Sequence, residues 1–204
     1  MGSGGKCRRM AADDAENGLT VRLADLSDAG QILEIYAYYV ENTAITFEYQ
    51  VPTLEEFRGR ISKIAERYPY LVAESNGGIQ GYCYAASFKD RDAYNWAVET
   101  TVYVKQGCRG RGVGKVLYEC MEAVLRKQNI LNLNACIAYP NPESIAFHEK
   151  MGYKAAAHFH KCGYKHGVWY DMVWMEKFLG DHPEEPQDVI PAARFAEQAV
   201  KKIK

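Results

Sequence analysis

The sequence lacks an excess of charge of either sign: lysine and arginine number 25, and aspartate and glutamate number 26, among 204 residues. Proteins that grip nucleic acid or an anionic membrane usually carry a clear basic excess. We therefore expect neither nucleic acid nor a membrane as a partner, and any anion site must be local. No stretch approaches the roughly 20 apolar residues needed to cross a bilayer.

Cysteine is sparse, and no two cysteines have the CxxC spacing. Two of the six lie inside periodic apolar segments and look like small core residues; the six are Cys7, Cys83, Cys108, Cys120, Cys136 and Cys162. This usage is typical of a reducing compartment rather than of a disulfide framework, so we expect a cytoplasmic protein. Residues 1–18 have no apolar core after their charges, which excludes a secretory signal. We interpret them as a disordered leader or an expression remnant.

The hydrophobic content of 48% is enough for a sizeable core, and the length suits one domain with tails. Periodicity predicts a strand over 19–24, a helix to about residue 41, and a second helix that Thr53 and Glu56 begin with a capping box. Two strands joined by Asn76-Gly77-Gly78 follow, and then a further strand. After the glycine loop we expect a helix, a strand, a short helix and two closing strands. We expect the domain to span 19–179.

Residues 180–204 differ in composition from this domain. The stretch "DHPEEPQDVIP" is acidic and contains proline, which predicts a linker. Phe195, Ala199 and Ile203 then recur at helical spacing, which predicts a short amphipathic helix at the end of the chain.

The segment "VYVKQGCRGRGVGK" places three glycines between a predicted strand and the most regular helical pattern in the chain. Glycines at 110, 112 and 114 let successive N–H groups point at a ligand, and the helix that begins near Gly112 favours an anion there. A merely tight turn explains the glycines equally well. The nucleotide motif GxxxxGK[ST] is absent because Val116 follows Lys115, and GxGxxG lacks its third glycine, so a nucleotide-binding module is disfavoured.

The spacing that does occur, Arg109-x-x-Gly112-x-Gly114 after "VYV", resembles the acetyl-CoA pyrophosphate loop of the GCN5-related N-acetyltransferases (GNAT). The element order resembles their fold, an α/β (α+β) fold with a mixed central sheet of about six to seven strands flanked by helices. The segments "NTAITFEYQVPT", "RDAYNWAVETTVYV", "SIAFHEKMGY" and "GYKHGVWYDMVWMEK" are similar to the phosphinothricin and methionine sulfoximine acetyltransferase branch.

The resemblance implies acetyl-CoA as cosubstrate and no metal. The main chain of the strand before the loop would bind the pantetheine arm, the loop amides would hold the pyrophosphate, and the next helix would bind the arm through Asn141, with Ser144 one turn later. A simple helix cap before Pro142 explains Asn141 equally well on sequence alone. The implied main-chain positions are Val102, Tyr103 and Val104, then Arg109, Gly110, Arg111, Gly112, Val113 and Gly114.

The resemblance also implies two catalytic residues. Glu99 lies among apolar strand neighbours, where burial should raise its pKa, and it matches the proposed general base of this branch, acting directly or through a water. A solvated glutamate at a sheet edge is the alternative. His148 stands where most of the superfamily has a tyrosine that assists the departing thiolate, and a structural histidine is the equally weighted alternative.

For the acceptor, Arg91 resembles an arginine placed near a substrate carboxylate, and Phe47 and Tyr94 are expected to wall the pocket. Tyr49 stands where relatives often have a smaller polar residue, so the acceptor itself is left open. A late motif of this branch is also matched, although stabilisation of a turn explains its residues as well; they are Lys165, His166, Trp169 and Asp171.

The hypothesis with most support is an N-acetyltransferase that acts on the α-amine of a small amino acid or analogue, working as a homodimer as its relatives commonly do. Acetylation of another amine, such as a polyamine, an aminoglycoside or a protein N-terminus, is the alternative among enzymes. A sensor that binds acetyl-CoA without catalysis is the alternative of another class, and the presence of both Glu99 and His148 argues against it.

Overall fold

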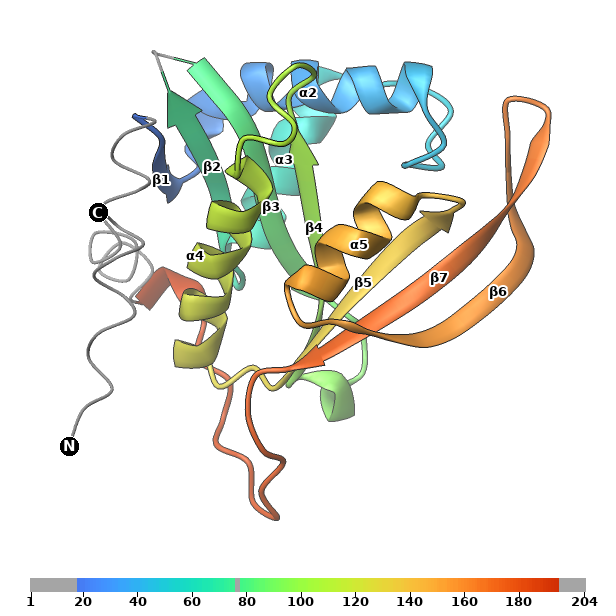
Figure 1. The fold of residues 1–204 in the computed structure, drawn as a ribbon. Helices are drawn as coiled ribbons and strands as arrows, with labels where there is room; N and C mark the ends of the chain where they lie inside the picture. The colour runs from blue at the N-terminus through green and yellow to red at the C-terminus, as the bar shows by residue number, and fades with distance from the viewer. Residues whose placement is uncertain (1–17, 76–77, 195–204) are drawn as a thin grey trace.

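A computed structural model of the chain describes residues 18–75 and 78–194 (Figure 1). Within these ranges the core of the fold is one seven-stranded sheet with the order β1-β2-β3-β4-β5-β7-β6. This agrees with the mixed sheet of six to seven strands expected from the sequence. The strands are β1 (Thr20–Leu23), β2 (Tyr70–Ser75), β3 (Gly78–Ser87), β4 (Ala97–Val104), β5 (Asn132–Tyr139), β6 (Lys154–Lys165) and β7 (Val168–Phe178).

The sheet is two antiparallel parts joined by one parallel contact. Strands β1 to β4 pair antiparallel in sequence order, and β5, β7 and β6 form the second antiparallel part. β4 and β5 pair in parallel, and only over Ala97–Glu99 with Asn132–Asn134. The two parts of the sheet therefore meet at one end of β4 and β5 and separate toward the other (Figure 1).

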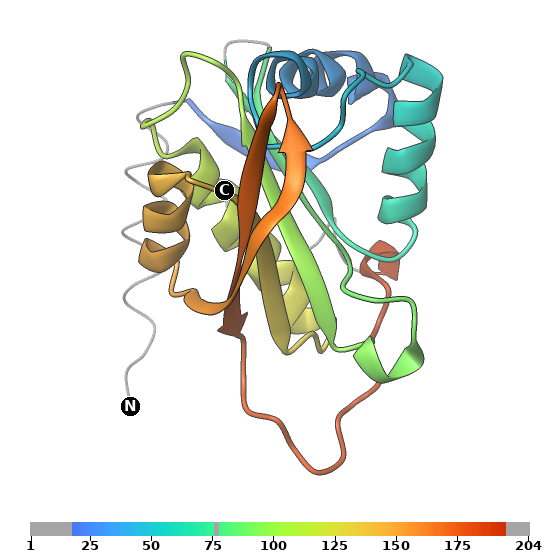
Figure 2. The ribbon, with the colours of Figure 1, turned by 90° about the vertical axis from the view of Figure 1, so that its right-hand side faces the viewer.

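Helices cover both faces of this sheet (Figure 2). Helices α2 (Ala29–Asn42) and α3 (Leu54–Ala65) pack with one apolar cluster, which includes Ile32, Phe57 and Tyr82. Helix α4 (Val113–Lys127) lies on the other face and belongs to the larger cluster. Helix α5 (Pro142–Lys150) lies on this face too, and short 3₁₀ turns occur at Leu26–Asp28, Asp92–Tyr94 and Ala192–Arg194.

The local signals read from the sequence explain where these helices begin and end. Thr53 caps α3, since its hydroxyl accepts from the Glu56 amide at 3.2 Å and the Glu56 carboxylate accepts in return from the Thr53 amide at 2.8 Å. That capping box confirms the prediction. Gly152 has a φ of 90° just after α5, a backbone conformation that glycine adopts without strain.

The first part of the predicted linker runs back along the domain. The Trp96 indole donates to the Gln187 carbonyl at 2.8 Å, and the Gln128 side-chain amide donates to the Ile190 carbonyl at 2.8 Å. Ala192 is 2% exposed and belongs to the larger apolar cluster. The predicted leader, apart from Gly18, and the predicted terminal helix lie outside the described residues. Among those described, no helix has the length and apolarity to span a membrane.

Candidate active site

The separation of β4 from β5 creates the opening in which the candidate site lies. β4 continues to Val104 and β5 to Tyr139, well beyond their shared pairs, and the two strands diverge (Figure 1). Two neighbouring cavities occupy this opening. We call them the loop cavity and the acceptor cavity, and both are lined by Ile45, Val102, Asn141 and Ser144.

The loop cavity, about 330 Å³, lies against the glycine-rich turn and the start of α4. Gly110 and Gly112 have φ angles of 75° and 83°, which L side chains rarely adopt. Gly112 is also the N-cap of α4 and has no side chain to satisfy the first amides of the helix. The uncapped amides of the first turn and the positive end of the helix dipole together favour an anion in this cavity.

The two arginines of the turn are placed differently from each other. The Arg109 guanidinium lies over the Tyr39 ring, 5.3 Å from its centroid, and 3.7 Å from the Glu143 carboxylate, so it is held at the rim of the loop cavity. Arg111 is exposed and does not line the cavity. The cationic residues in the cavity lining are thus Arg109 and Lys115, beside the main chain of Gly110, Gly112 and Gly114.

Of the three β4 positions expected to contact the cosubstrate, two line the loop cavity and the third, Tyr103, lines the acceptor cavity. Val102 and Val104 of β4 line the loop cavity, whereas the Tyr103 side chain points into the opposite apolar cluster, as the alternation of a strand requires. The Tyr39 hydroxyl donates to the Val104 carbonyl at 2.5 Å, which fixes the end of β4.

Asn141 performs the capping role considered as its alternative and also lies at the junction of the two cavities. Its side-chain oxygen accepts from the Ser144 amide at 3.2 Å, which begins α5. Both residues line both cavities. The capping bond uses the oxygen of the side chain, and no hydrogen bond from its amide nitrogen is present among the described residues.

The acceptor cavity, about 260 Å³, brings Glu99 of β4 and His148 of α5 into one lining. Glu99 is partly buried, and burial raises the pKa of its carboxyl above the ordinary value, while the nearby Lys89 lowers it by a smaller amount. Within the described residues no group donates a hydrogen bond to this carboxylate. A carboxylate with a raised pKa and free lone pairs is suited to accept a proton.

His148 is 4% exposed, and both of its ring nitrogens already have partners. Nδ1 lies 2.8 Å from the Ser144 carbonyl oxygen, so Nδ1 carries the hydrogen. Nε2 lies 3.0 Å from the Tyr118 hydroxyl and accepts from it when the ring is neutral. Burial lowers the pKa of His148, which keeps the ring neutral near pH 7.

This histidine continues into a buried network behind the acceptor cavity. The Tyr118 hydroxyl also lies 3.3 Å from Thr100 Oγ1, and the Tyr153 hydroxyl lies 3.0 Å from the same oxygen. Thr100 donates to the Asn134 carbonyl at 3.2 Å. Tyr118, Thr100 and His148 all line the cavity, so a polar chain runs from α5 through α4 to β4.

Phe47 lines the acceptor cavity and packs closely against a glycine. A side chain at Gly163 of β6 would clash with the Phe47 ring, so the absence of a Cβ allows this contact. The Tyr49 hydroxyl donates to the Tyr164 carbonyl nearby. The segment between α2 and α3 is therefore attached to the β6–β7 hairpin at the point where it lines the cavity.

Lys165 makes the same attachment from the other side. Its side chain is 1% exposed, and its ammonium donates to the Val40 carbonyl at 2.7 Å and to the Thr46 carbonyl at 2.8 Å. Burial lowers the pKa of this amine. A buried lysine that bonds main-chain oxygens fixes both the end of α2 and the segment that carries Phe47.

Arg91 and Tyr94 do not line either cavity. Arg91 is exposed and precedes the 3₁₀ turn, and Tyr94 packs edge-on against Phe88 at 5.9 Å between ring centroids. Their predicted contact with the acceptor stays a prediction. Tyr118 and Gly163 were not expected from the sequence to contribute to the site, and Lys165 was expected only as part of a late motif. A tyrosine within the apolar stripe of α4 was a visible signal of a buried hydroxyl.

Comparison with known proteins gives a consistent result. The model of the acetyltransferase (GNAT) domain matches residues 21–174. A phosphinothricin N-acetyltransferase of Streptomyces viridochromogenes is 34% identical over 176 residues, which cover 86% of this chain and 95% of that protein. An L-methionine sulfoximine/L-methionine sulfone acetyltransferase of Salmonella typhimurium is 30% identical, over 80% of this chain and 96% of that protein.

A solved structure has the same architecture. The crystal structure of a GNAT superfamily phosphinothricin acetyltransferase from Sinorhizobium meliloti, in complex with AcCoA, superposes with a TM-score of 0.81 at 34% identity. The match covers 86% of this chain and 97% of that one.

Proposed function

The chain belongs to the GNAT family of acetyltransferases, and on that premise we propose that it transfers the acetyl group of acetyl-CoA to the α-amine of a small amino acid or analogue, of the phosphinothricin or methionine sulfoximine type. One observation carries the proposal. A cavity built on the uncapped start of α4 adjoins a second cavity that contains a carboxylate with a raised pKa.

The residues of the loop cavity fit acetyl-CoA. The pyrophosphate would meet the main-chain amides from Arg109 to Gly114, and the pantetheine arm would lie in the opening between β4 and β5. Polar main-chain groups of β4 beyond Glu99 lack partners on β5, so they are available to an amide-bearing arm. Asn141 and Ser144 stand where that arm would enter the acceptor cavity.

Glu99 is proposed as the general base. An α-amine with a pKa of about 8 is mostly protonated at pH 7, and only the free amine attacks a thioester. The Glu99 carboxylate, directly or through a water, takes that proton, and its raised pKa makes it a better acceptor than an ordinary glutamate. The amine nitrogen then forms the new bond to the acetyl carbon, and the bond from that carbon to sulfur breaks.

The departing thiolate needs a proton donor or an oriented dipole. His148 is neutral and accepts from Tyr118 at Nε2, so its ring has no hydrogen facing that side. We propose that the Tyr118 hydroxyl turns its one hydrogen from His148 Nε2 to the thiolate sulfur as the bond to sulfur breaks, and that His148 positions the hydroxyl until then. Tyr118 would then take the role that the family usually gives to a tyrosine at the position of His148.

The acceptor cavity favours a small amine. Its 260 Å³ are closed on one side by Phe47 and the β6–β7 hairpin, and its lining includes Tyr84, Cys136 and Met172 beside Glu99. Glu99 is the one carboxylate in that lining, so a polycation finds no acidic groove here. This composition supports an amino acid or analogue over a polyamine or an aminoglycoside.

We also propose that the protein acts as a cytoplasmic homodimer. The five described cysteines are all free, as expected in a reducing compartment. Exposed apolar side chains gather on the β6–β7 hairpin, namely Phe159, Tyr164, Val168 and Trp169, and they offer a surface for a second copy. Light scattering after size exclusion tests the dimer, and a monomeric mass would contradict it.

The experiment that tests the activity is release of free thiol from acetyl-CoA with mass detection of the acetylated product. The panel contains phosphinothricin, methionine sulfoximine, methionine sulfone, ordinary amino acids, spermidine and an aminoglycoside. Turnover confined to the amino acids and their analogues supports the proposal. A preference for spermidine or the aminoglycoside would overturn the acceptor, and tight binding of acetyl-CoA without turnover of any amine would favour a sensor.

A further inference from the structure

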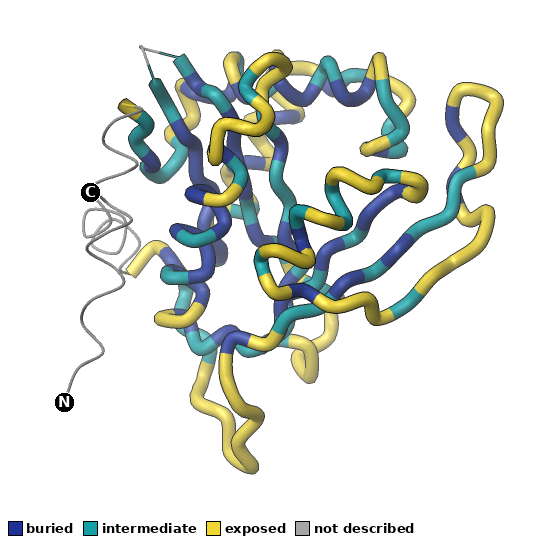
Figure 3. Tube along the Cα trace, in the orientation of Figure 1, coloured by how far each residue is buried: buried dark blue, intermediate teal, exposed yellow. Residues whose placement is uncertain are grey.

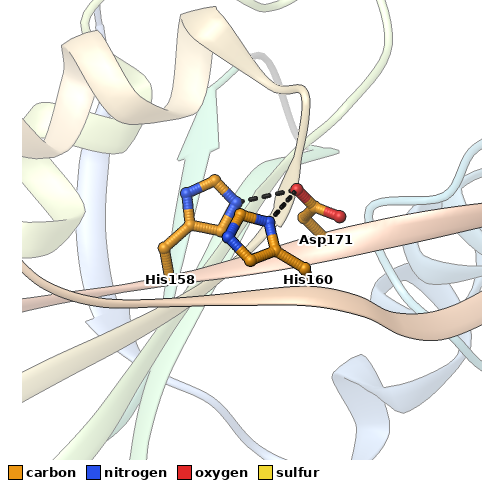
Figure 4. A group of neighbouring side chains, drawn as sticks. All are labelled: His158, His160 and Asp171. Atoms are coloured by element: carbon orange, nitrogen blue, oxygen red, sulfur yellow. Dashed lines mark hydrogen bonds and ion pairs between the residues drawn. The ribbon is translucent and has the colours of Figure 1, made fainter.

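The β6–β7 hairpin carries a cluster of polar side chains that neither cavity uses. His158 and His160 extend from β6 and Asp171 from β7, and their polar ends converge on one point (Figure 4). None of the three lines the loop cavity or the acceptor cavity. The hairpin reaches away from the body of the domain, and most of β6 is exposed there (Figure 3).

A break in the β6–β7 pairing brings the three side chains together. Phe159 pairs with Met172 and Gly163 pairs with Tyr170, so residues 160–162 of β6 lie opposite the single residue Asp171. Lys161, within this bulge, has a φ of 48°. Such a bulge redirects side chains locally, and here it turns His160 toward the same carboxylate that His158 reaches.

The carboxylate is held from two sides. The Lys161 amide donates to Asp171 Oδ1 at 2.8 Å, which leaves Oδ2 toward the histidines. His158 Nε2 lies 2.8 Å and His160 Nδ1 lies 3.1 Å from that oxygen. The His158 ring in turn packs against Tyr139, with 5.1 Å between the centroids. Two of the three clustered side chains, Asp171 and His158, are therefore held in place before any ion binds.

These donors have the spacing of a metal site. One nitrogen from each histidine and one Asp171 oxygen all lie within 4.8 Å of one another. A tetrahedral Zn²⁺, at about 2.1 Å from each ligand, separates neighbouring ligand atoms by roughly 3.4 Å. The distances to Oδ2 need to lengthen only slightly, and the side chain of His160, 77% exposed, is free to turn.

The chemistry of the donor set selects the class of ion. Two imidazole nitrogens with one carboxylate oxygen suit divalent transition metals such as Zn²⁺, whereas Mg²⁺ and Ca²⁺ prefer sites built from oxygen alone. Because His158 and His160 are both exposed, water has access to complete the coordination. We propose that His158, His160 and Asp171 form a site for one divalent transition metal ion of the Zn²⁺ class, which clips β6 to β7 across the bulge.

The ion would act on the hairpin rather than on the reaction. Beyond the bulge, the same hairpin carries Gly163 and Lys165, which contact the segment around Phe47. A clip that joins the strands before this point would stabilise the hairpin that walls the acceptor cavity. The proposal does not depend on the identity of the acceptor.

The test uses the full chain without a histidine tag, freed of metal with a chelator that is then removed. Co²⁺ is added as a spectroscopic probe, and Zn²⁺ is used to displace it. We expect a visible absorption band that saturates at one Co²⁺ per chain and disappears on addition of Zn²⁺. No band, or a band that Zn²⁺ fails to displace, would overturn the proposal.

Variants locate the site. His160→Ala should weaken Co²⁺ binding by at least about 10-fold, since loss even of an outer partner often has an effect of this size. The matched control is His182→Ala, which removes an exposed histidine at a distance, next to Asn132. Cys162→Ser tests the exposed thiol beside the cluster. Equal affinity in wild type and His160→Ala, or a loss in either control, would place the metal elsewhere.

A stability readout is independent of the absorption band. An ion that binds only the folded chain raises Tm in proportion to ln(1 + [Zn²⁺]/Kd). Zn²⁺ should therefore raise the Tm of wild type and of His182→Ala, and leave that of His160→Ala unchanged. His160 is so exposed that its removal should not unfold the protein, and a circular dichroism spectrum checks this. An equal Tm shift in all three proteins would contradict the site.

Discussion

The Tyr118 hydroxyl lies 3.0 Å from His148 Nε2, and the opposite ring nitrogen lies 2.8 Å from the Ser144 carbonyl. This pair fixes the tautomer of the histidine, since a carbonyl oxygen accepts only an N–H. It also places the hydroxyl group of the pair on α4, whereas the family's usual tyrosine would lie on α5. The histidine at the family's usual tyrosine position is therefore coupled to a tyrosine, and the first prediction separates their contributions.

Tyr118→Phe should lower kcat by about 10-fold or more with little change in the affinity for acetyl-CoA, because the variant removes only the hydroxyl proposed to assist the thiolate. Tyr153→Phe is the matched control. It removes a second buried hydroxyl bonded to Thr100 but not to His148. Both variants should lose about 1–3 kcal/mol of stability. If they lower kcat equally, Tyr118 has no special role.

The pH dependence of stability should report on His148. Burial lowers its folded pKa below the ordinary 6.5, so the unfolded chain binds more protons in this range. The neutral histidine's contribution is fully present above pH 6.5 and is lost as the pH falls through the folded pKa. Urea unfolding at pH 8 and pH 5.5 should therefore show a smaller loss for His148→Gln than for wild type. Equal losses would mean that His148 titrates normally.

Glu99→Gln should lower kcat by about 10²–10⁴-fold and abolish the acid limb of the pH profile, while the Kd of acetyl-CoA stays nearly constant. The same substitution should increase the stability of the protein at pH 8. A raised carboxyl pKa gives stability below the ordinary 4.5 that is lost as the pH rises through the folded pKa, so the charged form is a cost at pH 8.

The amide variant should accordingly melt higher than wild type at pH 8. Glu66→Gln, an exposed substitution at the residue that follows α3, is the control for both readouts. Wild-type turnover of Glu99→Gln from pH 6 to pH 9 would remove Glu99 from the role of base.

Gly112→Ala should raise the Kd of acetyl-CoA by about 10-fold or more. The new Cβ meets no protein atom within 4 Å, but it would face the cavity and would strain a φ of 83° by about 1–2 kcal/mol. Gly107→Ala has the same φ problem, at 82°, in the same loop, and does not line the cavity. Calorimetric titration of both variants therefore distinguishes strain from obstruction, and equal Kd values would indicate strain alone.

Gly163→Ala should raise the KM of the acceptor amine by about 10-fold and leave the Kd of acetyl-CoA unchanged, because the added methyl group displaces Phe47 from its wall. Gly59→Ala, on the surface of α3 with no atom near the new Cβ, serves as the control and should slightly stabilise the helix. A lower affinity for acetyl-CoA in Gly163→Ala would show that the change spreads beyond the acceptor cavity.

Much of the fold follows from local patterns in the sequence. The apolar stripe of α4, the capping box at Thr53 and the turn after Lys165 were all predicted and all occur. Glu99 was predicted to be partly buried because its strand neighbours are apolar, and it is half-buried in the structure. These features depend on residues near one another in sequence, where periodicity and turn chemistry act directly.

The parts of the site that the sequence did not predict depend on long-range contacts. Lys165 bonds Thr46 across 119 residues, and Phe47 rests on Gly163 through a contact that only the closed sheet creates. The partner of the Tyr118 hydroxyl, His148, comes from α5, 30 residues away in the sequence. Arg91 was assigned to the acceptor by resemblance; it is exposed and does not line the acceptor cavity, and its contact with the acceptor stays a prediction.

The loop cavity is lined partly by glycine main chain and the acceptor cavity by side chains, and this difference has an evolutionary consequence. At the loop cavity, part of the lining is main chain of Gly110, Gly112 and Gly114, and main-chain amides persist through most substitutions that keep the turn's shape. At the acceptor cavity, the walls are the side chains of Phe47, Tyr84 and Met172, each open to replacement one codon at a time. A lineage with this architecture can exchange the amine that it modifies without rebuilding the means by which it captures its acetyl donor.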